Sequence, residues 1–420
     1  MHPAAQALAA GGYDALGVGL SGSGFLAFFF VGALAAMRDL GLIDQKSTKF
    51  AGSSGGAIIA LASALHCPYE TCARAMADHL VDDCAATGRS CFGTLDRAIE
   101  GALGKALTLL PGPMLPEGAA GGGGVNATVL RRANGRAFVA MSLAPPSRCE
   151  LEASVQRQMQ LERRTRLLRE SGGAGRPSNA TAEGAAGAAG GDGAEDGGGG
   201  DAAAEQQQRA AAVARAVRAR ASKTWLVSEF TSVEDGIAAA RASSFIPGFS
   251  APRALSTFRG RVVFDGMLTT PLPCPTGVRH CLRVSAVPRG ESVMGLTAPI
   301  READVAPGLW SGNGTGRFTR HEWDAFTLSL GRVADRREVE RLGYAEAVAW
   351  ARANGLADAA RNRALAARGA AAAAAGGRAA AGGRAAALER AAAAGAGDDG
   401  AGVARGGTDG AGAGKSLVVG

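Results

Sequence analysis

The sequence has no apolar run long enough to cross a membrane. Its most apolar run, residues 26–37, falls well short of the roughly 20 residues that a membrane-spanning helix needs, and it predicts a buried helix instead. The N-terminus, MHPAAQALAAGG, lacks the basic start and the continuous apolar core of a secretory signal. These absences predict a soluble or peripherally bound protein of the cytoplasm, and so short an N-terminus leaves targeting to an organelle open.

Cysteine and histidine are too few and too scattered for several kinds of site. The seven cysteines are an odd number without a Cys-x-x-Cys pair, which predicts buried, reduced thiols rather than a disulfide scaffold or a zinc site. Of the five histidines, only His280 and His321 could complete a Ser-Asp-His triad in hydrolase chain order, and we interpret them as surface or core residues. We therefore expect neither a metal nor a cofactor.

Two long segments lack the large apolar side chains that a packed core requires. Residues 172–204 are nearly all Gly, Ala, Asp and Glu, and residues 357–414 are mostly Ala, Gly and Arg. Such compositions cannot offset the entropy of ordering the chain. We expect one domain over residues 13–354, interrupted by a low-complexity insertion at 171–222 and followed by a disordered tail at 355–420.

The formal net charge of +7 raises the question of an anionic partner. Arginine exceeds acid mainly at residues 157–169, at 209–220 and in the tail, which flank or belong to the low-complexity segments. This placement favours a solvated charged face, so we expect no nucleic-acid partner. Contact with a membrane surface stays open, and the predicted helix at 150–170 is the candidate for it.

The first 65 residues alternate between apolar strands and apolar helices. Residues 15–20 predict a buried strand, and residues 25–40 predict a helix that ends at Gly41. A second strand begins at Lys49, and residues 57–65 form a helix that is apolar on all sides. This order is typical of a right-handed βαβα unit in a parallel sheet, and so of an α/β fold.

The glycines at 17, 19 and 22 form a G-x-G-x-x-G pattern, which also occurs in dinucleotide-binding folds. Such a fold places an acid at the end of the next strand to bind the ribose hydroxyls. This chain has Gly52-Ser53-Ser54-Gly55-Gly56 at that point. The mismatch argues against a nucleotide site.

The pentapeptide at 52–56 fits the nucleophile-elbow pattern G-x-S-x-G with Ser54 at its centre and Gly52 and Gly56 at its ends. In such an elbow the serine lies on a strained turn between a strand and a helix, and small neighbours let the two segments pass close to it. The helix N-terminus would favour an alkoxide at Ser54. In so glycine-rich a chain the pattern also arises by chance, and its position after an apolar strand is what favours the elbow.

A nucleophile for acyl transfer needs hydrogen-bond donors aimed at the developing oxyanion. Gly22, Ser23 and Gly24 follow the neighbouring strand, so their backbone N–H groups could form an anion nest at the same edge of the sheet. The alternative is an ordinary tight turn. Because the predicted elbow lies beside it, we prefer the oxyanion site.

The candidate base lies in the segment RVVFDGMLTTPLP. Residues 261–264 predict a strand, Asp265 stands at its tip, and Gly266 allows a sharp turn. A carboxylate could take the Ser54 proton directly if burial beside Phe264 and Met267 raised its pKa. An ordinary turn aspartate is the alternative.

With these segments in order, the chain resembles the patatin-like phospholipase family, most of all the branch that contains adipose triglyceride lipase and adiponutrin. The matching text is GLSGSGFLAFFFVGALAAMRDLGL, FAGSSGGAIIALASAL, TWLVSEFTSVEDGIAAARASSFIPGFSAP and VVFDGMLTTPLP, with a closing helix in ERLGYAEAVAWA. The resemblance implies a three-layer α/β fold with a mainly parallel central sheet. It implies Ser54 as the nucleophile, Asp265 as the base, and the N–H groups of Gly22, Ser23, Gly24 and Gly55 as the oxyanion hole.

The sequence departs from the family pattern at two positions. Ala27 replaces the last glycine of the family's glycine loop, and Met267 follows Asp265 and Gly266 where the family has a small residue. A bulky Met267 would narrow the site or reduce activity. The insertion looks like an expanded hairpin between the strands RAFVAMSL and TWLVSEF, with helix at 150–170 and 205–222, and should leave the site intact.

The resemblance implies a lipase or phospholipase-type esterase of lipid degradation, which hydrolyses glycerolipids through an acyl-enzyme. Its expected partner is the surface of a lipid droplet or membrane, contacted peripherally. Two alternatives use the same fold. One is a catalytically weak lipid-droplet binding protein, and the other is a lipid acyltransferase.

Overall fold

The computed structural model divides the chain into residues 1–362 and 363–420. The second unit lies outside the described residues, and so do most of the predicted tail and most of the predicted insertion. The start of the predicted tail is wrong, because residues 355–357 are described and Leu356 is fully buried in the core. The other domain limits given above stay a prediction. The structure describes residues 3–4, 6–7, 12–85, 91, 93–110, 129–144, 153, 157, 160, 212, 215, 217–219, 221, 223–293, 295–312, 314–328 and 331–357.

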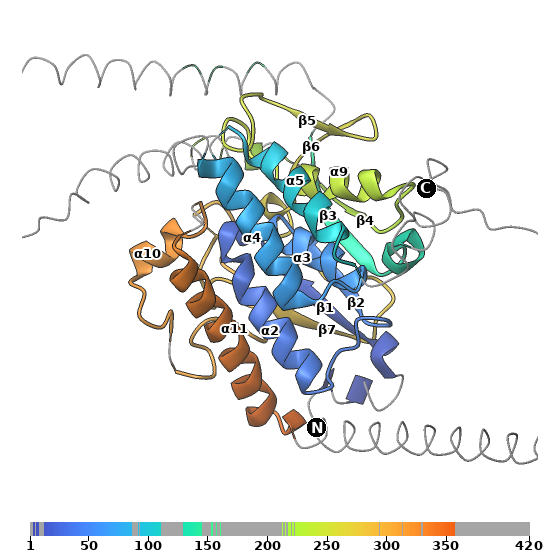
Figure 1. The fold of residues 1–420 in the computed structure, drawn as a ribbon, viewed down its shortest axis with the longest axis vertical. Coiled ribbons are helices and arrows are strands. Elements are labelled where there is room, and N and C mark those ends of the chain that lie inside the picture. The colour runs from blue at the N-terminus through green and yellow to red at the C-terminus, as the bar shows by residue number, and fades with distance from the viewer. Residues whose placement is uncertain are drawn as a thin grey trace, which may run out of the picture. The chain divides into compact units, whose positions relative to one another are not determined.

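The described residues form a three-layer α/β fold, as expected, around a seven-stranded mixed sheet (Figure 1). The strands are β1 (Leu16–Leu20), β2 (Lys49–Ser53), β3 (Ala137–Leu143), β4 (Lys223–Val227), β5 (Ser256–Phe258), β6 (Arg261–Asp265) and β7 (His280–Val284). The α-helices are α2 (Ala27–Asp39), α3 (Gly55–Ala64), α4 (Tyr69–Ala85), α5 (Leu95–Leu107), α9 (Val233–Ser243), α10 (Arg320–Ala325) and α11 (Val333–Ala353). Three 3₁₀ turns are η1 (Gly12–Ala15), η2 (Gly24–Leu26) and η3 (Gly266–Leu268).

The predicted βαβα unit is confirmed at the N-terminal half of the sheet. Strands β1 and β2 pair in parallel, and every residue of β1 is buried. Helix α2 begins at Ala27, two residues later than expected, because η2 forms the first turn. After α2, Gly41 has a φ of +65°, a left-handed conformation that glycine adopts without strain. Helix α3 begins at Gly55, earlier than its apolar pattern indicated.

The sheet has a parallel centre and antiparallel edges. Strands β3, β2, β1 and β7 run parallel to one another, whereas β4 and β6 pair antiparallel with β3, and β5 pairs antiparallel with β6. Residues 139–140 pair with both β2 and β4, and residues 141–143 pair with both β4 and β6. Since a strand has two edges, β4 occupies one edge of β3, and β2 and β6 share the other, end to end.

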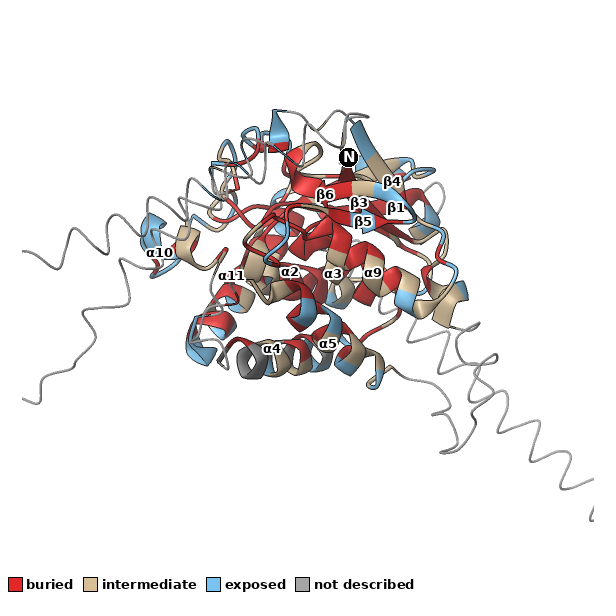
Figure 2. Ribbon diagram, turned by 90° about the horizontal axis from the view of Figure 1, so that it is seen from above, coloured by how far each residue is buried: buried red, intermediate tan, exposed pale blue. Residues whose placement is uncertain are grey.

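Helices cover the sheet in successive layers (Figure 2). Helices α2, α3 and α9 lie next to the strands, and α4 and α5 form the next layer outward. Helix α11 packs along α2 so closely that a Cβ on Gly32 would collide with the carbonyl oxygen of Glu340. A Cβ on Gly343 would likewise collide with the carbonyl oxygen of Phe29. Among the described residues, no helix is both long and apolar enough to span a membrane.

The interpretation of the insertion as an expanded hairpin is confirmed at its two ends. Strands β3 and β4 pair antiparallel, with Leu143 opposite Lys223. Of the segment 150–170, the described residues 153, 157 and 160 are helical, and the rest lies outside the described residues. Of the segment 205–222, the described residues 212, 215, 217 and 218 are helical.

The prediction of reduced thiols is wrong for at least five cysteines, since Cys67 is also disulfide-bonded. Cys84 forms a disulfide with Cys91, and Cys274 forms one with Cys281. The two cysteines of each of these pairs are seven residues apart in the chain, a wider spacing than that of a Cys-x-x-Cys pair. The second disulfide ties β7 to the segment that precedes it.

Candidate active site

Ser54 lies between β2 and α3, on the turn that the elbow pattern predicted. Its φ of 54° and ψ of −129° are a left-handed conformation that costs a residue with a side chain on the order of 1–3 kcal/mol. The flanking glycines are required by close backbone contacts. A Cβ on Gly52 would collide with the carbonyl oxygen of Gly56, and a Cβ on Gly56 would lie 2.7 Å from that of Leu20. The glycines therefore let strand, turn and helix pass one another at Ser54.

Ser243, at the end of α9, holds the Ser54 backbone in place. The Ser54 N–H donates to Ser243 Oγ over 2.9 Å, and Ser243 Oγ donates to the carbonyl oxygen of Ala140 in β3 over 2.6 Å. Ser243 is fully buried. Sequence analysis missed this residue, although the polar pair Ser243-Ser244 at the end of an alanine-rich helix was a usable signal.

Asp265 is the last residue of β6 and is fully buried. Its N–H donates to the Phe245 carbonyl oxygen over 2.9 Å, and its own carbonyl oxygen accepts from Ser142 Oγ over 2.7 Å. The side-chain oxygen Oδ1 accepts from the Met267 N–H over 2.9 Å. The other carboxyl oxygen of Asp265, Oδ2, is buried and has no hydrogen-bond partner among the described residues.

Burial raises the pKa of Asp265 from 3.8 to about 7. Hydrogen bonds from the Met267 N–H and the Ser54 side chain lower this pKa, but by less than burial raises it. The carboxyl group is thus close to half ionised at neutral pH, which is the condition for an efficient general base.

Strand β3 brings Ser54 and Asp265 together. On the edge that β2 and β6 share, Ala140 pairs with Ser53 and the next residue, Met141, pairs with Asp265. Both candidate residues line one cavity, and the Ser54 side chain acts on the Asp265 pKa. A Cβ on Gly266 would collide with the Ala140 carbonyl oxygen, so the turn after Asp265 also requires its glycine.

The glycine loop, residues 22–24, lies against the start of α3. Its residues differ in whether they line the cavity and whether their N–H groups are already bonded. The Gly22 N–H donates to the Pro271 carbonyl oxygen over 3.0 Å, so it is not free to face an oxyanion. The same oxygen accepts from Ser53 Oγ over 3.2 Å. Gly24, with a φ of +53°, and Gly55 both line the cavity beside Ser54. Gly22 and Ser23 are not among the described residues that line this cavity.

The cavity at Ser54 is apolar. Its walls come from α2, α3, α4 and α5, from the segment 244–249 after α9, and from Met267. Met267 is buried against the glycine loop, where a Cβ on Gly22 would lie 2.6 Å from the Met267 Cβ. Ionisable groups are almost absent: among the described lining residues Asp265 is the one carboxylate, and there is no histidine. The cavity is suited to a hydrocarbon chain that ends at Ser54.

The described residues contain no group of three His, Cys, Asp or Glu side chains that could hold a metal ion. Comparison with known proteins gives one family. The model of the family described as patatin-like phospholipase matches residues 19–276, a stretch that begins in β1 and contains both Ser54 and Asp265. No curated protein sequence matches this chain.

Proposed function

Since the chain belongs to the patatin-like phospholipase family, whose members are lipid acyl hydrolases, we propose that Ser54 and Asp265 form its catalytic dyad. One observation supports this assignment above all. A strained serine at a helix N-terminus shares an apolar cavity with a buried carboxyl group whose pKa lies near 7. These are the properties that an ester-cleaving nucleophile and its base require.

The proposed reaction passes through an acyl-enzyme. Ser54 Oγ attacks the ester carbonyl carbon while its proton moves to Asp265, and the tetrahedral intermediate carries its negative charge on the former carbonyl oxygen. The N–H groups of Gly24 and Gly55 stabilise that oxyanion. The alcohol leaves with the proton from Asp265. A water molecule then attacks the acyl carbon while its proton moves to the ionised Asp265. The bond between the acyl carbon and Ser54 Oγ breaks as Asp265 returns that proton to Ser54, so the fatty acid leaves and the dyad is restored.

We propose a glycerolipid as the substrate, either triacylglycerol or phospholipid, in the manner of the branch that contains adipose triglyceride lipase and adiponutrin. The cavity supports the acyl part of this proposal, because its lining is mostly apolar and its polar side chains besides Ser54 and Asp265 are those of Ser244 and Thr327. Such a substrate lies in an aggregate, so we further propose that the protein acts peripherally at a lipid droplet or membrane surface, in the cytoplasm or in an organelle.

The test uses a fluorophosphonate probe and a short-chain nitrophenyl ester. Ser54→Ala should lose probe labelling and should lower kcat by at least about a thousandfold, as removal of a nucleophile does in serine hydrolases. Asp265→Asn should lower kcat comparably. The matched control is Ser63→Ala, because Ser63 Oγ donates to the Ile59 carbonyl oxygen within α3 and is fully buried. Labelling that persists in Ser54→Ala would contradict the proposal.

The position of Met267 supports one alternative, a lipid-binding protein of low activity. Met267 lines the cavity two residues after Asp265 and occupies space beside the base. Met267→Ala should then raise turnover of bulky esters severalfold, since it removes part of the wall. If the wild-type protein binds liposomes but hydrolyses none of a panel of glycerolipids, the binding function replaces the hydrolase. An acyltransferase would instead transfer acyl groups to added monoacylglycerol, which product analysis detects.

A further inference from the structure

The Cys84–Cys91 disulfide is packed against the wall of the cavity at Ser54. Both cysteines are 2% exposed, and the partly buried apolar residues in contact with them are Phe25, Phe28, Leu80 and Leu95. All four of these residues also line the cavity. The disulfide is thus directly behind the surface that would contact an acyl chain.

The disulfide joins two helices that form different walls of the cavity. Cys84 belongs to the last turn of α4, whose residues Met76 and Leu80 face the cavity. Cys91 is bound to the start of α5, because its carbonyl oxygen accepts from the N–H groups of Thr94 and Leu95 over 3.1 and 2.9 Å. The cross-link therefore limits how far the end of α4 can move from the start of α5.

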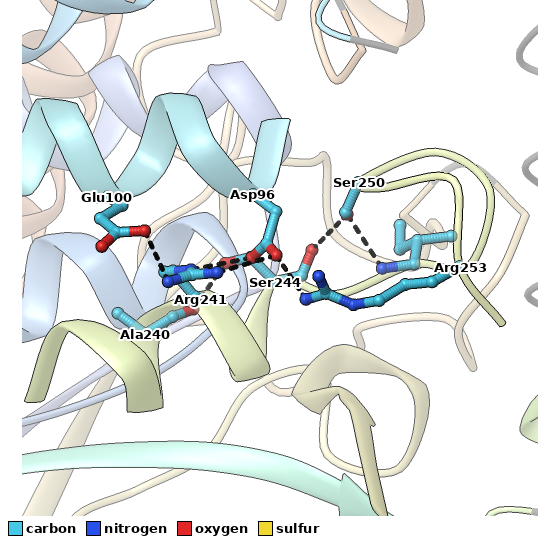
Figure 3. A network of polar contacts seen from close by, with 8 residues as sticks. Asp96, Glu100, Ala240, Arg241, Ser244, Ser250 and Arg253 are labelled. Atoms are coloured by element: carbon cyan, nitrogen blue, oxygen red, sulfur yellow. Dashed lines mark hydrogen bonds and ion pairs between the residues drawn. The ribbon is translucent and has the colours of Figure 1, made fainter. Parts of the chain in front are cut away.

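Helix α5 is also fixed on its other side. Asp96 lies between the guanidinium groups of Arg241 and Arg253 (Figure 3), and it accepts two hydrogen bonds of 3.0 Å from Arg241 in α9. The N–H of Asp96 donates to the Ser250 carbonyl oxygen over 3.0 Å. With α5 held to α9 in this way, α4 is the wall whose separation from α5 the disulfide restrains.

We propose that the Cys84–Cys91 disulfide sets the width of the acyl pocket and so selects the acyl chains that the enzyme accepts. The proposal rests on the function proposed above. With the cross-link closed, α4 stays against α5 and the pocket favours short chains. When the cross-link opens, α4 can move away from α5, and longer or bulkier chains gain access to Ser54. Cys84 and Cys91 are positioning residues here, since they act through the pocket wall.

A dithiol reductant can open the cross-link. One thiolate of the reductant attacks a sulfur of the disulfide, breaks the S–S bond and forms a mixed disulfide. The second thiol of the reductant then displaces the enzyme's sulfur. The enzyme ends with two thiols, and the reductant ends as a disulfide. Because both sulfurs are buried, we expect the reaction to require transient opening of the end of α4.

The experiment compares two double variants. Cys84→Ala with Cys91→Ala removes the cross-link behind the pocket wall. Cys274→Ala with Cys281→Ala is the matched control, since that disulfide spans the same number of residues and joins β7 to the segment before it, neither of which lines the pocket. The readout is the ratio of kcat/KM for a sixteen-carbon nitrophenyl ester to that for a four-carbon ester. We expect the first variant to raise this ratio about fivefold or more, and the control to leave it unchanged.

A general loss of stability would lower both rates together and leave the ratio unchanged, so the ratio separates positioning from unfolding. Reduction of the wild-type protein with dithiothreitol should also raise the ratio of long-chain to short-chain kcat/KM. This measurement takes the place of the Cys84→Ala, Cys91→Ala variant if the variant does not fold. A ratio that is unchanged or lower after loss of Cys84–Cys91, with ester hydrolysis intact, overturns the proposal and leaves the hydrolase function standing.

If the wild-type protein hydrolyses no ester, the proposed function fails. The effect of the disulfide on the pocket is then tested by measuring fatty-acid binding instead of hydrolysis. A fluorescent eighteen-carbon fatty acid is titrated into Ser54→Ala protein with and without the Cys84–Cys91 disulfide. The proposal expects at least about threefold tighter binding without the cross-link. Equal or weaker binding overturns it.

Discussion

The buried carboxyl group of Asp265 gives the proposed reaction a defined pH dependence. The base has to be ionised to accept the Ser54 proton, and burial raises its pKa from 3.8 to about 7. Below that pKa, kcat/KM for a neutral ester should fall about tenfold for each pH unit, and above it kcat/KM should level off. A pH–rate profile from pH 5 to 9 measures this. A profile already level at pH 5 would show that Asp265 is not the base.

The same group makes stability depend on pH. The pKa of Asp265 is higher in the folded than in the unfolded protein, so protonation of this group adds to the free energy of unfolding. That contribution is complete below pH 4 and is lost as the pH rises to about 7. The full effect is at most about 4 kcal/mol. Asp265→Asn cannot ionise, so its free energy of unfolding relative to wild type should increase from pH 4 to pH 7. Denaturant titrations of both proteins test this, and a constant difference would contradict it.

The hydroxyl of Ser243 should matter for catalysis more than for stability. Ser243→Ala removes the acceptor for the Ser54 N–H, which loosens the nucleophile without opening a large cavity. We expect kcat for a short ester to fall about ten- to a hundredfold with little change in KM. The control Ser63→Ala should keep wild-type kcat. Equal kcat in both variants would remove the positioning role of Ser243.

Sequence reasoning located Ser54 and Asp265 because each lies at the end of an apolar strand, beside glycine. It could not predict that Ser243 accepts from the Ser54 N–H, or that the Gly22 N–H donates to the Pro271 carbonyl oxygen. Both are hydrogen bonds between segments far apart in the chain. Ser243 and Ser54 are 189 residues apart. Such contacts leave no periodic pattern in a sequence.

At the scale of elements, the apolar runs predicted the central strands well because those strands are buried on both faces. They did not predict that β2 and β6 share one edge of β3. That pairing is antiparallel and short, from Met141 to Leu143, and it is the feature that places Asp265 next to the elbow. The disulfides were missed for a related reason, since the cysteines meet only when α4, α5 and β7 are in place.

The link between α5 and α9 depends on one buried acid. Asp96 is 5% exposed and its pKa is lowered by Arg241 and Arg253 in spite of burial. Asp96→Asn removes the charge that Arg241 and Arg253 share and leaves Arg241 with its surface partner Glu100 alone, and it should lower the free energy of unfolding by about 2–3 kcal/mol. Glu100→Gln is the control, since Glu100 pairs with Arg241 at the surface and its loss should cost less than about 1 kcal/mol. Similar losses in both variants would contradict this.

At the scale of the whole molecule, two cross-links change the expectation about the compartment. Disulfides persist in oxidising surroundings and are rare in the reducing cytosol. The structure pairs Cys84 with Cys91 and Cys274 with Cys281. Peptide mapping of the protein isolated from its cells under alkylating, non-reducing conditions should recover both cross-linked peptides. Recovery of these four cysteines only as alkylated thiols would instead support the cytoplasm.

The domain should fold without most of the segment between β3 and β4. Leu143 pairs with Lys223, so the two ends of this long connection already lie side by side, and a short loop can join them. Replacing residues 150–205 with about six Gly and Ser residues keeps the described helical positions 212 to 218, where Val217 is buried and Arg218 contacts Leu296. We expect Tm to change by less than about 3 °C, and kcat for a short ester to stay within about twofold. A control that also removes residues 206–218 should lose Tm through the exposed contacts of Val217. If the first replacement unfolds the protein, the segment belongs to the folded domain and is more than a connection.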